Sequence, residues 1–477
     1  MAIPQDQTDL AYLSAAECLR RYRSGDLSPV DVLQAQQARH AEIGERVNAF
    51  TETMDDWALQ RARESEARYR DGDPLPLDGI TVGIKEKHAI KGYRITQGST
   101  AWDGEVPDRS TPYVERLLDA GVVPVGRTTT PEFCIAPFTH TDMWGVTPSA
   151  WNADFAAGGS SGGSGAALAA GLVTLATGSD IGGSTRIPSA FNGVYGFKGP
   201  YGRIPGNGAM ALEYFRGDSA MGRGVEDVRL MQNVMSGPSP RDHASLRPKL
   251  VIPEEQPGVE GLRIALDFTL GDFLVDDEII ANTRALADGL AARGAEIVEV
   301  HVPWTREMLM RAVSMHFALM EIPWIQESSA AHPERLLDYT RAILEQMGPL
   351  VGKTTLYDSA RAEAPVQEAL AQAMVGFDAL LCPTTAAVGL PAGDSLVGGV
   401  EINGTKVPSL EAVMSTPFNV CNRCPIMAAP TGHAANGMPT GVQIVGQTYD
   451  DLTVFRIAAV AQEVTGWDYS RGHRPEL

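Results

Sequence analysis

The sequence predicts an α/β protein, because short apolar runs alternate with helical patterns along the chain. The clearest unit is a strand over residues 80–84, a helix over 113–120 that Gly121 ends, and a second strand over 122–125. A similar alternation follows near residue 262 and again at the C-terminal end. Strand–helix–strand units of this kind are typical of a sheet covered by helices.

The other elements follow from local signals. The first 70 residues have a helical pattern, and Ser28-Pro29-Val30-Asp31 is typical of a helix start, with a capping serine, a proline and an acid three residues on. The later elements, in order, are a strand over 262–266, a helix over 277–292, a strand over 296–300, a largely helical stretch over 308–374, strands ending at 383 and over 441–445, and a helix from Asp450 with Gly466 as its C-cap.

Length and composition restrict the class of protein. A chain of 477 residues exceeds the roughly 250–300 residues of one hydrophobic core, which predicts two or three domains or one large sheet with thick helical layers. The net charge of −20 argues against nucleic acid and anionic membranes as partners. No secretory signal is found, and five cysteines are an odd number, so we expect a cytoplasmic protein without disulfides.

A block of glycine and serine, residues 158–165, is the strongest local signal. A flexible linker is disfavoured because an Ala/Leu-rich helix follows at once. A phosphate-binding loop fails because no Gly-Lys-Ser/Thr is present. A nucleophile elbow formally fits, but it needs a hydrophobic strand before it, and residues 151–157 are polar and irregular.

A second serine, Ser184, follows two glycines in the segment Ser179-Asp180-Ile181-Gly182-Gly183-Ser184. Glycines allow successive backbone N–H groups to turn toward one point and hold an anion. The tetrahedral intermediate of acyl transfer carries such an anion, and a serine beside this nest stands where a nucleophile is needed. A tight structural turn explains the segment equally well when it is taken alone.

Six segments in the same order resemble the amidase signature enzymes over nearly the whole chain. They are Leu77–Glu86, Gly126–Phe133, the Gly/Ser block, Asp180–Pro188, Gly193–Lys198 and Gly437–Gly446. The resemblance implies one domain over residues 1–477 with a large twisted mixed sheet flanked on both faces by helices. Its parts would be a helical segment to about residue 72, a core over about 73–250, and a C-terminal part with a helical pocket segment at 304–375.

The resemblance also implies a Lys–cis-Ser–Ser triad. By position, Lys85 is the base, Ser160 the bridging serine and Ser184 the nucleophile. The oxyanion hole would consist of the backbone N–H groups of Ile181, Gly182, Gly183 and Ser184. A serine hydroxyl needs a base, and lysine acts as one only when burial lowers its pKa from about 10.4. Ser160 can accept and donate, and can therefore pass the proton between them.

Several residues near these segments have less certain roles. Ser161, Asp180 and Arg186 are expected to support the nucleophile loop, although an ordinary salt bridge elsewhere is an equal alternative for the charged two. The family usually has Lys-Asp where this chain has Lys85-Glu86. Cys421 and Cys424 have C-x-x-C spacing, which we interpret as two buried thiols rather than a metal site. His433 would matter only if the nucleophile elbow were correct.

The predicted function is hydrolysis of C–N bonds in small amides or carbamates (urethanes) through a seryl acyl-enzyme, by a monomer or homodimer without cofactor or metal. Residues 134–144 and 304–347 are expected to line the pocket, and their apolar content suggests a bulky hydrophobic or aryl substrate. These side chains would serve a core equally well. They are Phe138, Trp144, Trp304, Met308, Met310, Phe317 and Trp324.

The alternative function is the amidase subunit of a glutamine-dependent tRNA amidotransferase, which would act with partner subunits and ATP. That subunit typically has Arg-Gln-Pro after its nucleophile, whereas this chain has Arg186-Ile187-Pro188. A binding protein without catalysis on the same fold is disfavoured, since all three triad positions are present.

Overall fold

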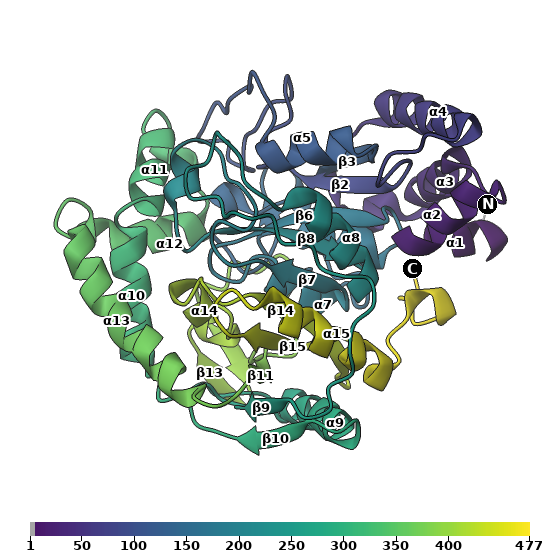
Figure 1. Cartoon of the computed structure of the whole chain (residues 1–477). Helices are drawn as coiled ribbons and strands as arrows, with labels where there is room; N and C mark the ends of the chain where they lie inside the picture. Colours follow the sequence, from purple (N-terminus) through teal and green to yellow (C-terminus); the bar gives the residue numbers. More distant parts are fainter. Residues whose placement is uncertain (1–4) are drawn as a thin grey trace.

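The computed structural model describes residues 5–477, and a single 11-stranded sheet runs through them (Figure 1). The sheet is mixed, with parallel pairs at β2 and β9 and antiparallel pairs through its middle. The strands, in spatial order, are β1 (Phe50–Thr53), β3 (Val123–Thr128), β2 (Thr81–Lys85), β6 (Leu175–Asp180), β8 (Gly217–Gly222), β7 (Tyr195–Lys198), β14 (Ile426–His433), β15 (Pro439–Gly446), β11 (Ala379–Pro383), β9 (Arg263–Leu266) and β10 (Glu296–Glu299).

Helices surround this sheet, and two short hairpins stand apart from it (β4, His140–Thr141, with β5, Gly145–Val146; β12, Val400–Ile402, with β13, Thr405–Val407). The helices are α1 (Gln5–Ala11), α2 (Ala15–Ser24), α3 (Pro29–Val47), α4 (Asp55–Asp71), α5 (Pro112–Asp119), α6 (Gly162–Ala169), α7 (Arg186–Asn192), α8 (Val225–Met235), α9 (Asp277–Ala292), α10 (Arg306–Phe317), α11 (Glu321–Ser328), α12 (Asp338–Met347), α13 (Leu356–Ala373), α14 (Pro417–Val420) and α15 (Asp451–Thr465). Across residues 5–477, no helix combines the length and the apolar character needed to cross a membrane.

Alternation along β15 explains why helices cover both faces of the sheet. Successive side chains of a strand point to opposite faces. Val442 and Ile444 join the hydrophobic core that includes α15. Gln443 points to the other face, where it contacts Arg186 of α7. The predicted mixed sheet between two helical layers is therefore confirmed.

Most of the predicted elements are present, close to their expected bounds. The helix start at Ser28 is a capping box in which Ser28 and Asp31 satisfy each other's backbone N–H groups, and Gly466 ends α15 with a φ of 61°. The N-terminal region is not wholly helical, because β1 interrupts it and pairs with β3. Strands β6, β7 and β8 of the large sheet were not predicted.

Sheet order positions the candidate site. Strand β2 lies parallel to β6, so the carboxyl ends of both strands meet at one edge. Lys85 is the last residue of β2, and Asp180 is the last residue of β6. The helices α10–α13 form a group on the opposite side of the molecule from α1–α4 (Figure 1). This group carries the predicted pocket segment.

Candidate active site

Lys85 lies at the centre of three serine hydroxyls. It is fully buried, and its Nζ donates to Ser160 Oγ at 2.7 Å, to Ser161 Oγ at 3.0 Å and to Ser179 Oγ at 3.1 Å. Burial lowers its pKa to about 7, because removal from water penalises the ammonium form. Near neutral pH a substantial fraction of Lys85 is therefore neutral and able to accept a proton.

Ser160 follows a cis peptide bond at Gly159 and is almost fully buried. Gly159 packs against the backbone of residues 136–138, and a Cβ there would lie 2.2 Å from the carbonyl oxygen of Phe138. Only glycine fits this close approach. Ser161 is the residue before α6, and its Oγ also accepts from the backbone N–H of Ser179 at 3.3 Å. Ser161 thus ties the Gly/Ser block to β6.

Ser184 is 7% exposed and lines a cavity. Within residues 5–477 its hydroxyl has no hydrogen bond to Ser160, although Ser161 N–H donates to its carbonyl at 3.1 Å. The four backbone N–H groups expected to bind the oxyanion are not all free of other partners. The N–H of Gly183 donates to Asp180 Oδ1 at 2.9 Å, whereas those of Ile181, Gly182 and Ser184 have no partner among the described residues. Three N–H groups therefore remain for an oxyanion.

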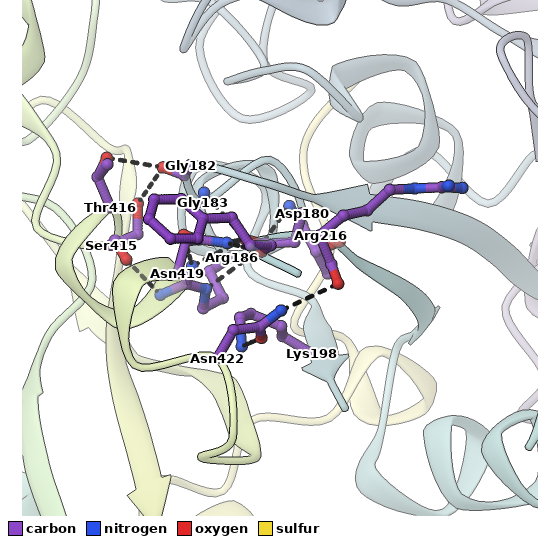
Figure 2. A network of polar contacts seen from close by, with 12 residues as sticks. Asp180, Gly182, Gly183, Arg186, Lys198, Arg216, Ser415, Thr416, Asn419 and Asn422 are labelled. Atoms are coloured by element: carbon purple, nitrogen blue, oxygen red, sulfur yellow. Dashed lines mark hydrogen bonds and ion pairs between the residues drawn. The ribbon is translucent and has the colours of Figure 1, made fainter. Parts of the chain in front are cut away.

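Asp180 and Arg186 form a fully buried ion pair at 2.8 Å beneath the nucleophile loop (Figure 2). Burial raises the pKa of Asp180, but the charge and hydrogen bonds of Arg186 outweigh it and hold this pKa well below its usual range. Arg186 also donates to the Asn419 side chain at 2.7 Å and to Ser415 O at 2.7 Å. Since Asp180 also accepts from the N–H groups of Gly183 and Thr185, the pair lies against the segment that carries Ser184.

Two hydroxyls far along the chain hold the same loop. Ser415 Oγ and Thr416 Oγ1 both donate to the carbonyl of Gly182, at 3.0 and 2.9 Å (Figure 2). Gly183 has a φ of +114°, and a Cβ on it would lie 1.7 Å from Ser415 Oγ. Glycine is therefore required at 183 both by its backbone conformation and by this contact. We did not predict the contribution of residues 415–419 from the sequence.

Removing both hydroxyls should slow the reaction more than it weakens substrate binding. In the double variant Ser415→Ala/Thr416→Val, we expect kcat to fall by about 10- to 100-fold with little change in KM, because one oxyanion donor is worth about 100- to 1,000-fold and here the donors are only loosened. The measurement is steady-state kinetics with a thermal melt. Thr465→Val, which removes a hydroxyl-to-carbonyl bond at the end of α15, is the control. An unchanged kcat in the double variant would contradict this role.

The cavity beside Ser184, which we call the apolar cavity, has a volume of about 100 Å³. Both predicted pocket segments contribute to it, through residues 134–137 and through helices α10 and α12. Of the predicted aromatic and Met side chains, Met310 and Phe317 line it, whereas Phe138 and Trp304 are core residues. Its charged lining residues, Arg306 and Glu411, pair with each other at 2.9 Å.

Among residues 5–477, the side chains of Glu86 and the two cysteines, which the sequence also singled out, contact only protein groups outside the serine cluster. Glu86, the departure from Lys-Asp, accepts from the backbone N–H groups of Thr96 and Gln97 and so orders that loop. Cys421 and Cys424 are buried free thiols, and burial raises the pKa of both.

His433 packs among aromatic side chains. Its ring lies 4.8 Å from Trp151 and 4.8 Å from Trp467. The residues that contact Lys85 come from other segments, so the structure gives His433 no part in the serine cluster.

Comparison with known proteins gives one family. The family model described as amidase matches residues 31–455. The A-subunit of the glutamyl-tRNA(Gln) amidotransferase of Chloroflexus aggregans is 30% identical, over 98% of this chain and 99% of its own, and that of Ralstonia pickettii is 30% identical, over 94% and 97%. A bacterial aryl acylamidase of the amidase signature family superposes with a TM-score of 0.88 at 26% identity, over 96% of this chain and 97% of its own.

Proposed function

This chain belongs to the amidase signature family of C–N hydrolases, and from that premise we propose that it hydrolyses amides or carbamates with a bulky apolar acyl group. The proposed nucleophile is Ser184, with Ser160 as the bridge and Lys85 as the base. Neutral Lys85 takes the proton of Ser160 while Ser160 takes that of Ser184. The Ser184 oxygen then bonds to the carbonyl carbon, and the N–H groups of Ile181, Gly182 and Ser184 bind the oxyanion.

Collapse of the tetrahedral intermediate breaks the C–N bond. The leaving nitrogen receives the proton back from Lys85 through Ser160, and the acyl group stays on Ser184. Water then attacks the ester, its proton passes to Lys85 along the same path, and Ser184 regains its hydrogen as the acid leaves. Since proton transfer needs a separation of about 2.6–3.2 Å, the contact between Ser184 and Ser160 has to form in the substrate complex.

The apolar cavity is the observation that supports the proposed substrate class. Leu309, Met310, Val313 and Phe317 of α10 face it beside Ser184, and its two charged residues, Arg306 and Glu411, form an ion pair with each other. Burying each further methylene of an acyl chain there gains about 0.8 kcal/mol, or roughly a fourfold increase in kcat/KM, until the space is filled. An aryl or alkyl acyl group therefore suits this cavity better than a charged one.

The test is a series of p-nitroanilides with acetyl, butanoyl, octanoyl and phenylacetyl groups, together with a p-nitrophenyl carbamate. We expect kcat/KM to rise along the alkyl series. Met310→Glu should flatten this rise, because a charge in the cavity opposes apolar burial. Met308→Glu is the control, since Met308 lies on the same helix outside the lining. Equal kcat/KM for all acyl groups would contradict the proposal.

A second candidate is the amidase subunit of a glutamine-dependent tRNA amidotransferase. The two relatives named above favour it, because both are named as a subunit of such an amidotransferase and align over nearly the whole chain. The apolar lining beside Ser184 argues against glutamine, whose amino-acid head needs charged partners.

Glutaminase assays separate the two candidates. If L-glutamine is hydrolysed only when partner subunits and ATP are added, while the anilides are not cleaved, the second candidate is correct. Hydrolysis of octanoyl anilide by the isolated chain, with no release of ammonia from L-glutamine in either condition, supports the first.

A further inference from the structure

A second cavity, which we call the charged cavity, adjoins the apolar cavity. The two share Cys134, Ile135 and Ile181 in their linings. The charged cavity has a volume of about 170 Å³, which is room for a group of several non-hydrogen atoms, since one water needs about 10–15 Å³. Its lining includes Lys87 and Glu321, and nothing in the proposed chemistry uses either residue.

Glu321 is a buried carboxyl group that lacks a partner. Glu321 is the first residue of α11 and is 6% exposed, and its carboxyl group makes no hydrogen bond or ion pair with any other residue in the described range 5–477. Burial raises its pKa to about 7. An unsatisfied buried carboxyl group is costly, so its place on a cavity wall indicates a ligand that supplies a hydrogen-bond donor.

Lys87 is the matching cation. It is half-buried, lines the same cavity, and likewise has no hydrogen bond or ion pair among residues 5–477. Its positive charge is also the largest electrostatic influence on Glu321 after burial, although no ion pair joins the two side chains among the described residues. Two other cations that act on Glu321 are already paired. Arg216 binds Asp218 at 2.8 Å, and His316 binds Glu213 at 2.6 Å. Of the charged lining residues that are at least half-buried, Glu321 and Lys87 are thus the acid and the cation without a hydrogen bond or ion pair among the described residues, and a further acid on the wall, Glu105, is exposed.

Lys87, on the wall of the charged cavity, follows Lys85 by two residues at the end of β2. Burial has the largest effect on the pKa of Lys85, and the positive charge of Lys87 adds to it, which places Lys87 within electrostatic reach of the base. The leaving nitrogen has to face Ser160 and Lys85, because these groups return its proton. The leaving group is therefore directed toward the charged cavity while the acyl group fills the apolar one.

We propose that the charged cavity binds a dipolar leaving group, an amine that carries both a carboxylate, which pairs with Lys87, and an ammonium group, which pairs with Glu321. Such a group gives Lys87 and Glu321 each a group of opposite charge. This inference rests on the proposed hydrolysis. The substrate class it defines is an apolar acyl group in amide linkage to an amino-acid-like amine.

Four octanoyl amides of matched length test the inference. Their leaving amines are the ε-amine of L-lysine, which is dipolar, 6-aminohexanoate, which has the carboxylate alone, 1,5-diaminopentane, which has the ammonium alone, and pentylamine, which has neither. We expect kcat/KM for the lysine amide to exceed that for the pentylamide by at least about 10-fold, because both new contacts are charge-assisted. Equal values, or a preference for either singly charged amine over lysine, overturn the inference.

Matched variants assign the effect to the two side chains. Glu321→Gln and Lys87→Met should each lower the ratio of kcat/KM for the lysine amide to that for the pentylamide by at least about 10-fold. Glu327→Gln on the exposed side of α11 and Lys91→Met on the surface make the same charge changes and should leave the ratio unchanged. A ratio that does not respond to Glu321→Gln contradicts the proposal.

Binding to Ser184→Ala separates this inference from the proposed hydrolysis. Calorimetry with Nε-octanoyl-L-lysine should give a Kd that weakens at least about 10-fold when Glu321→Gln is added. If the Ser184→Ala variant bound the ligand in this way but the wild type did not hydrolyse it, the proposed hydrolysis would be contradicted and the proposed role of the charged cavity would be supported. Equal turnover of all four amides would support the proposed hydrolysis and contradict the proposed role of the charged cavity. Hydrolysis of free L-glutamine that depends on Glu321 would place the cavity on the acyl side and also overturn the inference.

Discussion

Ser184→Ala is expected to lower kcat for octanoyl p-nitroanilide by at least about 1,000-fold, because the acyl-enzyme cannot form without the Ser184 oxygen. The residual rate would come from the three backbone N–H groups at residues 181, 182 and 184, which still polarise the carbonyl. Substrate binding should be retained, since the hydroxyl contributes little to the apolar cavity. Steady-state kinetics with a circular dichroism spectrum and a thermal melt measure this.

Two other serines provide the comparison. Ser189→Ala removes a buried hydroxyl of α7, the helix that begins two residues after Ser184; this Oγ donates to the carbonyl of Thr185, and the variant should keep most of the activity. Ser161→Ala removes one of the three hydroxyls around Lys85 and should have an intermediate effect. If Ser184→Ala retained full activity while Ser161→Ala lost it, Ser161 would be the nucleophile and the elbow interpretation of the Gly/Ser block would be correct.

The segments of the proposed site could be recognised in the sequence because their residues are close together along the chain. Lys85 ends a strand that its apolar neighbours identify, and the glycines at 182 and 183 precede Ser184 directly. The close approach of Gly183 to Ser415 and the packing of Gly159 against residues 136–138 explain those two glycines physically. A short motif therefore carried both the proposed reacting groups and the backbone shape around them.

The unpredicted strands lack the usual signals of a strand. Every residue of β6 and of β7 is buried, so their sequences have no alternation of apolar and polar positions. Strand β8 begins and ends with glycine. Pairing within the large sheet, rather than local propensity, makes these segments strands.

The supporting residues were beyond sequence analysis for a different reason. Ser415, Thr416 and Asn419 are ordinary residue types about 230 positions from the loop that they hold. Only the position of β14 and β15 beside β7, and of α7 against them, brings the two regions together. Lys87 and Glu321 are likewise distant in sequence, and their unpaired state is visible only once their neighbours are known.

Replacing Lys85 should have the second largest effect on catalysis. We expect Lys85→Met to lower kcat/KM by about 100- to 10,000-fold, the range that a general base contributes. Lys85→Arg should be equally inactive even though it keeps the positive charge and the hydrogen-bond donors, because a guanidinium cannot be deprotonated in a protein. An active Lys85→Arg variant would show that Lys85 acts by its charge and not as a base.

The proposed role of Lys85 as a base also predicts how the activity of the wild type changes with pH. Burial lowers the pKa of Lys85 to about 7, so the neutral, active form predominates above that pH and is lost below it. We therefore expect kcat/KM to rise with pH through a midpoint near 7 and to level off above about 8, with a slope of one below the midpoint. Lys85→Met should remove this rise from its residual activity.

A second lysine makes the assignment testable. Lys198 is also fully buried, donates to the Asn422 side chain, and burial lowers its pKa to about 7 as well (Figure 2). It contacts residues 422 and 424 rather than the serine cluster around Lys85. Lys198→Met should therefore keep the midpoint near pH 7 in whatever fraction of the protein folds, because a midpoint does not depend on the amount of active enzyme. If the midpoint disappeared in Lys198→Met and persisted in Lys85→Met, the titrating base would be Lys198, and the proton path through Ser160 would have to be abandoned.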